Sequence, residues 1–154
     1  FVAALLKNTP VFENGGRAAT TTFSQRNIGD VLVTFENEAN YVSKKLTQDQ
    51  FEIVYPSYTI ISEAPVAVVD SVVDKKGTRA AAEAYLKNLW SEPAQELAAN
   101  LYLRPRNAEV LAKHKADFPD IETFNPNEKF GAWSDIMKKF FADGGLFDQL
   151  SGKK

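Results

Sequence analysis

The chain has 154 residues, of which 44% are hydrophobic and 25% are charged, as is usual for one globular domain with a core. Its formal net charge is -2, so it lacks the basic excess of nucleic-acid binders and we expect no nucleic-acid partner. The absence of cysteine excludes disulfides and thiolate chemistry, and the single histidine, His114, argues against a zinc site. We therefore expect no metal and no cofactor.

The first part of the chain alternates between helix-like and strand-like segments, which predicts an α/β fold. Phe1–Lys7 has the pattern of an amphipathic helix, and no capping residue precedes it. We therefore expect the chain to be part of a longer one. Pro10–Phe12 is expected to be a short strand before the Asn14-Gly15-Gly16 turn, and a short helix is predicted over Thr20–Arg26.

The next stretch contains most of the predicted strands. Asp30–Phe35 is expected to be a buried strand, and Glu36–Leu46 has the composition of a helix. Further strands are predicted over Phe51–Tyr55, Tyr58–Ile61 and Val66–Val69, with prolines between them.

The second half of the chain is predicted to be mostly helical. Apolar residues recur at three- and four-residue spacing from Ala82 to Trp90, after a cap at Thr78. The later predicted elements are a helix opened by Ser91-Glu92-Pro93, a helix over Ala108–Lys115, an irregular segment or short strand over Phe118–Phe124, and a helix over Trp133–Phe141 closed by Gly144-Gly145.

Several single residues also carry expectations. Trp90 and Trp133 lie on apolar helix faces and are expected in the core, whereas His114 is expected to be solvated between two lysines. The lysine pairs Lys75-Lys76 and Lys153-Lys154 are interpreted as solvated rather than as recognition patches.

Asn14-Gly15-Gly16-Arg17 is the strongest local candidate for a binding site. Two glycines permit positive φ, so successive N–H groups can point into one concavity, and a helix starting near Thr20 adds further donors. Such a turn can hold an anion without any formal positive charge. On this local pattern alone, an ordinary tight turn between two elements is the favoured interpretation of the glycines.

Phe35 and Glu36 form a second candidate because they fall at the carboxyl end of a predicted strand, where open α/β sheets bind ligands. A core phenylalanine followed by an acidic first helical turn is the simpler alternative. Enzyme motifs are lacking: the sequence has no phosphate-binding glycine loop, and no serine lies in a nucleophile-elbow pattern.

The segment GGRAATTTFSQRNIGDVLVTFENEA resembles the corresponding stretch of bacterial sulfate- and thiosulfate-binding proteins. The likeness continues through FEIVYPSYTIISEAPVAVVDSVVDKKGT, AEAYLKNLWSEPAQELAANLYLRPRN, FPDIETF and FGAWSDIMKKFFADGGLFDQL. It thus extends over essentially the whole chain, which is far more specific than any single motif.

The resemblance implies the C-terminal half of a two-lobed, type II periplasmic solute-binding protein with an α/β fold. Residues 1–58 would end the second lobe and carry part of the anion site, and residues 59–154 would form the hinge crossover and the C-terminal part of the first lobe. It further implies a periplasmic, non-catalytic receptor whose partners are sulfate or thiosulfate, the membrane permease of an ABC transporter, and the missing N-terminal half. The alternative is a fragment of an α/β enzyme that acts on a sulfur oxyanion.

Carried over by position, the resemblance also implies the site residues. Gly16 would donate a backbone N–H to the anion, Arg17 would brace the binding peptides from behind, and Gly15 and Ala18 flank them. Phe35, followed by Glu36, stands where sulfate-specific members carry an indole donor, and thiosulfate-binding members also have phenylalanine there. Sulfate would then lose one hydrogen bond, worth roughly 1–3 kcal/mol.

Overall fold

The computed structural model describes residues 1–47 and 50–152 of the chain. The chain divides into two compact units, each built from separate segments of sequence. Unit 1 is Phe1–Phe35, Gln50–Ile61 and Ile121–Lys154, and unit 2 is Glu36–Asp49 and Ser62–Asp120. The content is mixed helix and sheet, as the sequence predicts. The division of the lobes at residue 58 stays a prediction.

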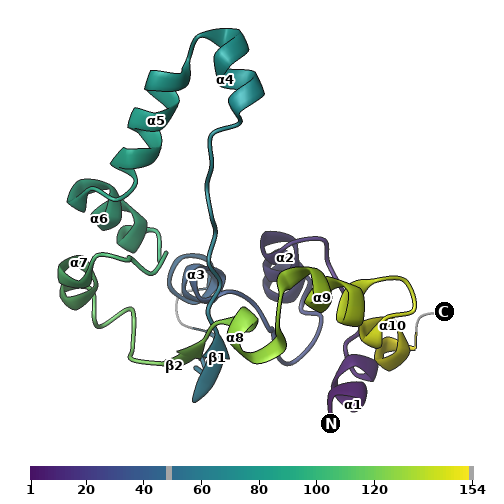
Figure 1. Ribbon diagram of the computed structural model, residues 1–154. Coiled ribbons are helices and arrows are strands. Elements are labelled where there is room, and N and C mark those ends of the chain that lie inside the picture. Colours follow the sequence, from purple (N-terminus) through teal and green to yellow (C-terminus); the bar gives the residue numbers. More distant parts are fainter. Residues whose placement is uncertain (48–49, 153–154) are drawn as a thin grey trace. The chain divides into compact units, whose positions relative to one another are not determined.

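Unit 1 combines short helices with a small parallel sheet. Its elements are α1 (Val2–Lys7), α2 (Gly16–Arg26), β1 (Tyr58–Ile60), β2 (Glu122–Phe124), α8 (Pro126–Phe130), α9 (Trp133–Ile136), the π-helical η2 (Met137–Phe141) and α10 (Leu146–Ser151). The two strands pair in parallel, with Tyr58 opposite Glu122 and Ile60 opposite Phe124 (Figure 1). Parallel strands need a long crossover, and here residues 61–121 separate the two strands in sequence.

Aromatic rings supply much of the packing in unit 1. The ring of Phe124 in β2 stacks on Tyr58 of β1 with centroids 4.8 Å apart, and its other neighbour is Phe130 of α8 at 6.1 Å. Phe12 and Phe147 meet edge to face at 6.0 Å, beside the packing of α1 against α10. Ring pairs in this range of separation are stabilising contacts.

The regular elements of unit 2, among the residues that the structure describes, are all helices. Its elements are α3 (Glu36–Tyr41), the π-helical η1 (Val42–Leu46), α4 (Asp70–Lys76), α5 (Arg79–Asn88), α6 (Glu92–Asn100) and α7 (Ala108–Lys113). Gly77 ends α4 at φ 64°, a left-handed conformation that favours glycine. Arg79 then ties α5 back to α4 by hydrogen bonds to Asp70 (2.7 Å) and Asp74 (2.9 Å).

The core of unit 2 lies between α6 and α7. Ala99, Val110 and Phe118 are almost completely buried there, and Leu111 packs against them. Side-chain caps start both helices: Ser91 accepts the N–H of Ala94 at 3.4 Å, and Asn107 accepts the N–H of Val110 at 3.1 Å. The caps satisfy donors that the helices leave unpaired at their first turns.

Most predicted helices are confirmed. The helices that begin near Phe1, Thr78, Ser91, Asn107 and Trp133 all form, and the Glu36–Leu46 helix forms with its second half π-helical. The helices α4, α8 and α10 were not predicted from the sequence; their signals are the glycine that ends α4 and the Asn125-Pro126 cap of α8. Lys75 and Lys76 are exposed, as expected, whereas Lys153 and Lys154 lie outside the described residues.

Four of the predicted strands are wrong. Tyr58–Ile60 and Glu122–Phe124 form a ladder, whereas the structure has no strand at the segments predicted over Pro10–Phe12, Asp30–Phe35, Phe51–Tyr55 and Val66–Val69. Over residues 31–35 and 51–55 the exposure nevertheless alternates from one residue to the next, which is the pattern of an extended chain. The sheet found among the described residues consists of β1 and β2, so these segments are not part of a ladder there.

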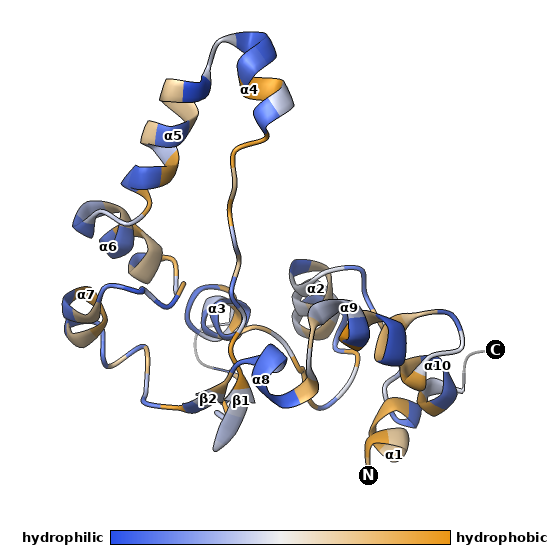
Figure 2. Ribbon diagram, in the orientation of Figure 1, coloured by the Kyte–Doolittle hydropathy of each residue, from blue (hydrophilic) through white to orange (hydrophobic). Residues whose placement is uncertain are grey.

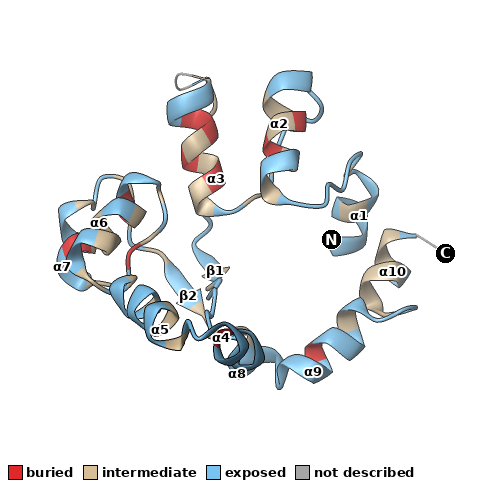
Figure 3. Cartoon of the chain, turned by 90° about the horizontal axis from the view of Figure 1, so that it is seen from above, coloured by how far each residue is buried: buried red, intermediate tan, exposed pale blue. Residues whose placement is uncertain are grey.

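Hydrophobic side chains are widely exposed in both units. Val31 and Val33 are 80% and 83% exposed, so the prediction that Asp30–Phe35 is buried is wrong. Trp90 and Trp133, expected in the core, are 60% and 56% exposed. Figure 2 shows hydrophobic colouring along the segment that enters α4, and Figure 3 shows buried residues only in short stretches such as those in α2 and α3.

Candidate functional site

The first turn of α2 carries four of the six residues that the sequence analysis singled out. Gly15 is the residue before the helix, and Gly16, Arg17 and Ala18 are its first three residues. Ala19 donates the first bond of the helix, to the carbonyl of Gly15 at 3.0 Å. The N–H groups of Gly16, Arg17 and Ala18 therefore precede the hydrogen-bond ladder of the helix.

This helix end is suited electrostatically to an anion. In the described part of the chain, Gly15 offers no side-chain cap and the first turn of α2 holds no acidic residue. The aligned peptide dipoles give the N-terminus of a helix a partial positive charge, and its N–H groups point outward. Gly15, Arg17 and Ala18 are exposed and Gly16 is half-buried, so the backbone of the turn is accessible.

Two details of this turn differ from the sequence-based prediction. The helix starts at Gly16 rather than near Thr20, so the glycines form the helix end instead of a loop before it. Gly15 is extended, at φ 171° and ψ 154°, and Gly16 is helical, so the expected positive φ is wrong. A Cβ at Gly15 would meet nothing within 4 Å. Neither backbone strain nor crowding within the chain therefore requires glycine at this position.

Polar contacts hold α2 in place behind this turn. The hydroxyl of Thr22 donates to the Glu13 carboxylate at 2.6 Å, which ties the helix to the segment that leads into it. The hydroxyl of Thr21 donates to the carbonyl of Arg17 at 3.0 Å. The buried residues of α2 are Thr20 and Thr22, so its buried face consists of threonine side chains rather than aliphatic ones.

Phe35 and Glu36 occupy the end of an extended segment and the start of α3. The side chain of Phe35 is 58% exposed, which rules out the alternative of a core phenylalanine within the described chain. The carboxylate of Glu36 accepts two hydrogen bonds from Arg104, from Nε at 2.9 Å and from Nη2 at 2.6 Å. The acidic start of α3, formed by Glu36 and Glu38, is also favourable for the helix dipole.

The structure brings together only part of the predicted set. One helical turn of unit 1 contains Gly15, Gly16, Arg17 and Ala18. Phe35 is the last residue of the first sequence segment of the same unit. Glu36 opens unit 2. That all six residues line one anion site stays a prediction.

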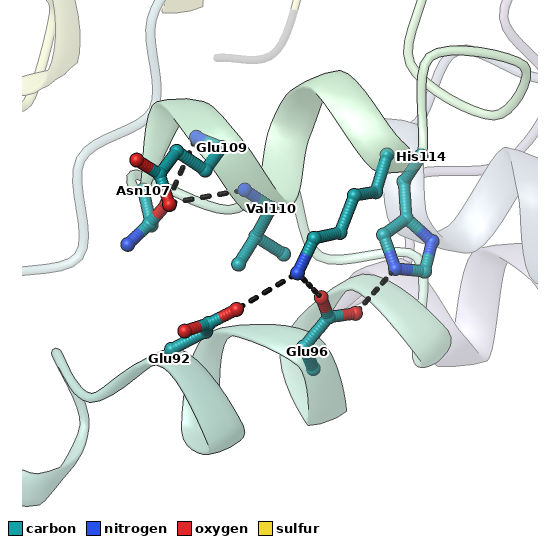
Figure 4. Close-up of polar contacts among 7 residues, drawn as sticks. Glu92, Glu96, Asn107, Glu109, Val110 and His114 are labelled. Carbon is teal, nitrogen blue, oxygen red and sulfur yellow. Dashed lines mark hydrogen bonds and ion pairs between the residues drawn. The ribbon is translucent and has the colours of Figure 1, made fainter.

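A second polar cluster joins α6 to α7 (Figure 4). His114 contacts Glu96 through Nε2 at 2.7 Å, and Lys113 Nζ donates to Glu92 at 2.8 Å and Glu96 at 3.1 Å. The hydrogen bonds from His114 and Lys113 lower the pKa of Glu96, and those to Glu92 and Glu96 raise the pKa of Lys113. The expectation of a solvated His114 is wrong, since its side chain is only 19% exposed.

The described residues contain neither a metal-binding cluster nor a membrane-spanning helix. Over residues 1–47 and 50–152, no group of three or more His, Cys, Asp or Glu side chains is arranged to hold a metal ion. Over the same residues, every helix is too short or too polar to cross a membrane.

Sequence reasoning missed Arg104, whose side chain holds Glu36. Arg104 lies in the Arg104-Pro105-Arg106 string between two predicted helices, and nothing local identifies a partner 68 residues away. The Glu96–His114 contact was missed for a similar reason. The sequence did contain one indication of this contact. Glu92 and Glu96 are four residues apart in a helix that begins after Ser91, so both carboxylates lie on one face of that helix.

The chain is similar to known proteins over nearly its whole length. Residues 1–100 match the family model described as bacterial extracellular solute-binding protein. A thiosulfate-binding protein of Pseudomonas aeruginosa is 57% identical over 97% of the chain, and a sulfate-binding protein of Escherichia coli is 52% identical over 98%. A thiosulfate-binding protein of Escherichia coli is 46% identical over 97%. The chain covers 45%, 46% and 44% of these relatives, less than half of each.

Proposed function

Because this chain belongs to the family of bacterial extracellular solute-binding proteins, we propose that it is part of a receptor for sulfate and thiosulfate. The observation that carries the proposal is the uncapped N-terminus of α2, in a chain with relatives named for these two anions. Such a receptor binds its anion and releases it unchanged. The expectation of a non-catalytic protein agrees with the relatives, all three of which are named as binding proteins.

The proposed mechanism of binding relies on neutral donors. The N–H of Gly16, at the first helical position, donates to the anion, and the partial positive charge of the helix end adds to the attraction. Arg17 braces this turn without pairing with the ligand, and Gly15 and Ala18 complete it. An extended glycine with open space at its Cβ position suits close approach of a ligand to the backbone.

Phe35 is the proposed determinant of which anion is preferred. Its ring has no N–H to offer, so a fully oxygenated sulfate gains no hydrogen bond there. The terminal sulfur of thiosulfate is a poorer acceptor, and an apolar ring beside it costs less. We therefore infer a relative preference for thiosulfate, with both anions able to bind.

A complementary segment, absent from this chain, is proposed to complete a two-lobed type II fold. The extended segments 31–35 and 51–55 support this proposal, because Val31, Val33 and Val54 are each about four-fifths exposed. Strands with such side chains are stable when a sheet neighbour pairs their backbone and covers their apolar face. We use "full-length receptor" for the chain together with that segment.

The proposed location is the periplasm, and the proposed partner is the membrane permease of an ABC transporter, which receives the anion from the closed receptor. The alternative, an α/β enzyme that acts on a sulfur oxyanion, has no support among the relatives. Turnover of sulfate or thiosulfate by the full-length receptor would favour that alternative. Stoichiometric binding without a product favours the receptor.

The variant Gly16→Pro tests the α2 site in the full-length receptor. Proline is well tolerated at the first position of a helix, where it removes the N–H and fits the backbone. We expect the dissociation constant for thiosulfate to rise about tenfold or more, because a hydrogen bond to a charged acceptor is lost. The matched control Gly16→Ala keeps the N–H and should bind nearly as tightly as the unmodified receptor. Equal affinity of the proline and alanine variants, measured by titration calorimetry, would refute the assignment.

A further inference from the structure

The helix formed by α3 and η1, residues 36–46, belongs to unit 2 but is joined at both ends to segments of unit 1. Phe35 precedes it in the chain, the segment that starts at Gln50 follows it, and both belong to unit 1. We call residues 36–46 the α3–η1 helix. Its contacts with residues 102–119 hold to unit 2 a stretch of chain that continues into unit 1 on both sides.

Two ion pairs, about two helical turns apart, hold the α3–η1 helix in unit 2. The Glu36 carboxylate accepts hydrogen bonds from Arg104 Nε at 2.9 Å and Nη2 at 2.6 Å, and Nη2 also donates to the carbonyl of Pro119 at 3.0 Å. Further along the helix, Lys44 Nζ donates to the carboxylate of Asp117. The four paired side chains are between 23% and 34% exposed, so water can solvate each partner when a pair separates.

The buried part of the α3–η1 helix is mainly polar. Its buried residues are Glu38, Asn40, Ser43 and Val42, of which the last alone is apolar. The core between α6 and α7, by contrast, is entirely apolar. Surfaces that separate and meet again are more polar than permanent ones, because polar groups regain hydrogen bonds to water on separation. The composition of this helix therefore favours a contact that can open over one that is permanent.

The lobe boundary implied by the resemblance bears on this contact. A boundary at residue 58 assigns the α3–η1 helix to the second lobe, and it assigns Arg104 and Asp117 to the first. The helix nevertheless pairs with those two residues within unit 2. Both assignments hold if the helix extends from one lobe and docks on the other.

We propose that the α3–η1 helix is a latch, which docks on residues 102–119 when the receptor closes on its anion and separates from them when the receptor is open. This inference rests on the proposed two-lobed receptor. Docking stabilises the closed form, so the apparent affinity for the anion rises with the strength of the two ion pairs. Without an anion the receptor is mostly open, and the latch then contributes little to its stability.

Charge reversal at the Lys44–Asp117 pair tests the latch in the full-length receptor. This pair is chosen because Glu36 is itself a candidate site residue. The variants are Lys44→Glu, Asp117→Lys and the double variant, in which the charges are exchanged and attract each other again. The matched control is Lys45→Glu, which makes the same charge change at an exposed neighbour of Lys44.

Two quantities are measured for each variant: the dissociation constant for thiosulfate, by titration calorimetry, and the melting temperature without anion. We expect each single reversal at 44 or 117 to raise the dissociation constant about fivefold or more, because like charges then oppose docking. The double variant should return to within about twofold of the unmodified receptor, and Lys45→Glu should stay within the same margin. Without anion, Lys44→Glu should melt at the same temperature as Lys45→Glu.

The latch is overturned if Lys44→Glu binds normally, or if the charge exchange does not restore binding. It is also overturned if Lys44→Glu without anion melts well below Lys45→Glu or fails to fold, because the contact would then be permanent. Should the double variant alone fail to fold, the two single variants still decide, because both must weaken binding. An unmodified receptor that binds neither anion overturns the proposed function itself. Normal binding by that receptor, together with any of the other outcomes above, overturns only the latch.

Discussion

At the scale of single residues, Phe35 is the proposed determinant of the preference between sulfate and thiosulfate. The side chain is exposed and lies just before α3, so substitution need not disturb a core. Its ring offers an apolar surface and no hydrogen-bond donor. A donor at this position would benefit sulfate, all of whose peripheral atoms are oxygens, more than thiosulfate.

The variant Phe35→Trp should therefore shift the preference of the full-length receptor toward sulfate. The added indole N–H restores one hydrogen bond to a charged acceptor, so we expect the affinity ratio of sulfate to thiosulfate to rise about tenfold. Competition titrations with both anions measure this ratio directly. The control Phe1→Trp adds the same ring at a fully exposed residue and should leave the ratio unchanged. A ratio that stays constant in Phe35→Trp would show that Phe35 does not face the ligand.

Local pattern identified candidate residues but could not distinguish a binding site from an ordinary turn or helix start. The glycines at 15 and 16 stood out because they are paired, and the structure places them at the start of α2, though without the left-handed conformation that was expected. Arg104 and His114 gave no such signal. Their partners, Glu36 and Glu96, are 68 and 18 residues away, and a contact over that separation depends on tertiary packing.

At the scale of elements, α6 and α7 show how ionic contacts add to a small core. Glu96 of α6 accepts from Lys113 of α7 and meets His114 just beyond it, and these contacts lower its pKa. A glutamate with a lowered pKa in the folded protein stabilises the fold at neutral pH. That contribution is lost as the pH falls through the lowered pKa, because both folded and unfolded states are then protonated.

Substitution of Glu96 by Gln should consequently destabilise unit 2 in a pH-dependent way. At pH 7 we expect Glu96→Gln to melt at a lower temperature than the unmodified receptor. The difference should shrink as the pH drops below about 4.3, the range where an unperturbed glutamate is protonated. Thermal melting followed by circular dichroism at several pH values provides the comparison.

The exposed Glu109 of α7 supplies the matched control for that experiment. Glu109→Gln removes the same charge from the same helix pair but leaves the Lys113 and His114 contacts of Glu96 intact. It should alter the melting temperature less at pH 7. A Glu96→Gln difference that persisted unchanged at low pH would mean that the contacts act through packing rather than through ionisation.

Helices were predictable from the sequence where their ends carry their own signals. Ser91 with Pro93 marks the start of α6, because a capping residue acts over a few residues. Gly77 ends α4 through an equally local effect, although α4 itself was not predicted. Strands were not predictable in the same way. The segment 30–35 has a strand's composition and extended backbone, but pairing requires a neighbour far away in sequence.

At the scale of the whole molecule, hydrophobic residues are distributed as expected for part of a larger fold. The buried hydrophobic residues among those described are Val42, Val73, Ala99, Val110, Phe118 and Ile136. Many larger side chains remain exposed, among them Trp90 and Trp133. Exposed apolar surface on this scale is typical of sites that another chain or segment covers. This is in line with a chain that spans less than half the length of its relatives.

The central claim, binding of sulfur oxyanions, is tested most directly by isothermal titration of the full-length receptor with thiosulfate and with sulfate. The account predicts saturable binding of one anion per receptor, with thiosulfate bound at least as tightly as sulfate. It also predicts far weaker binding by the isolated chain, which holds only part of the proposed site. Absence of saturable binding of either anion would contradict the proposed function, and sulfate binding much tighter than thiosulfate would contradict the role given to Phe35.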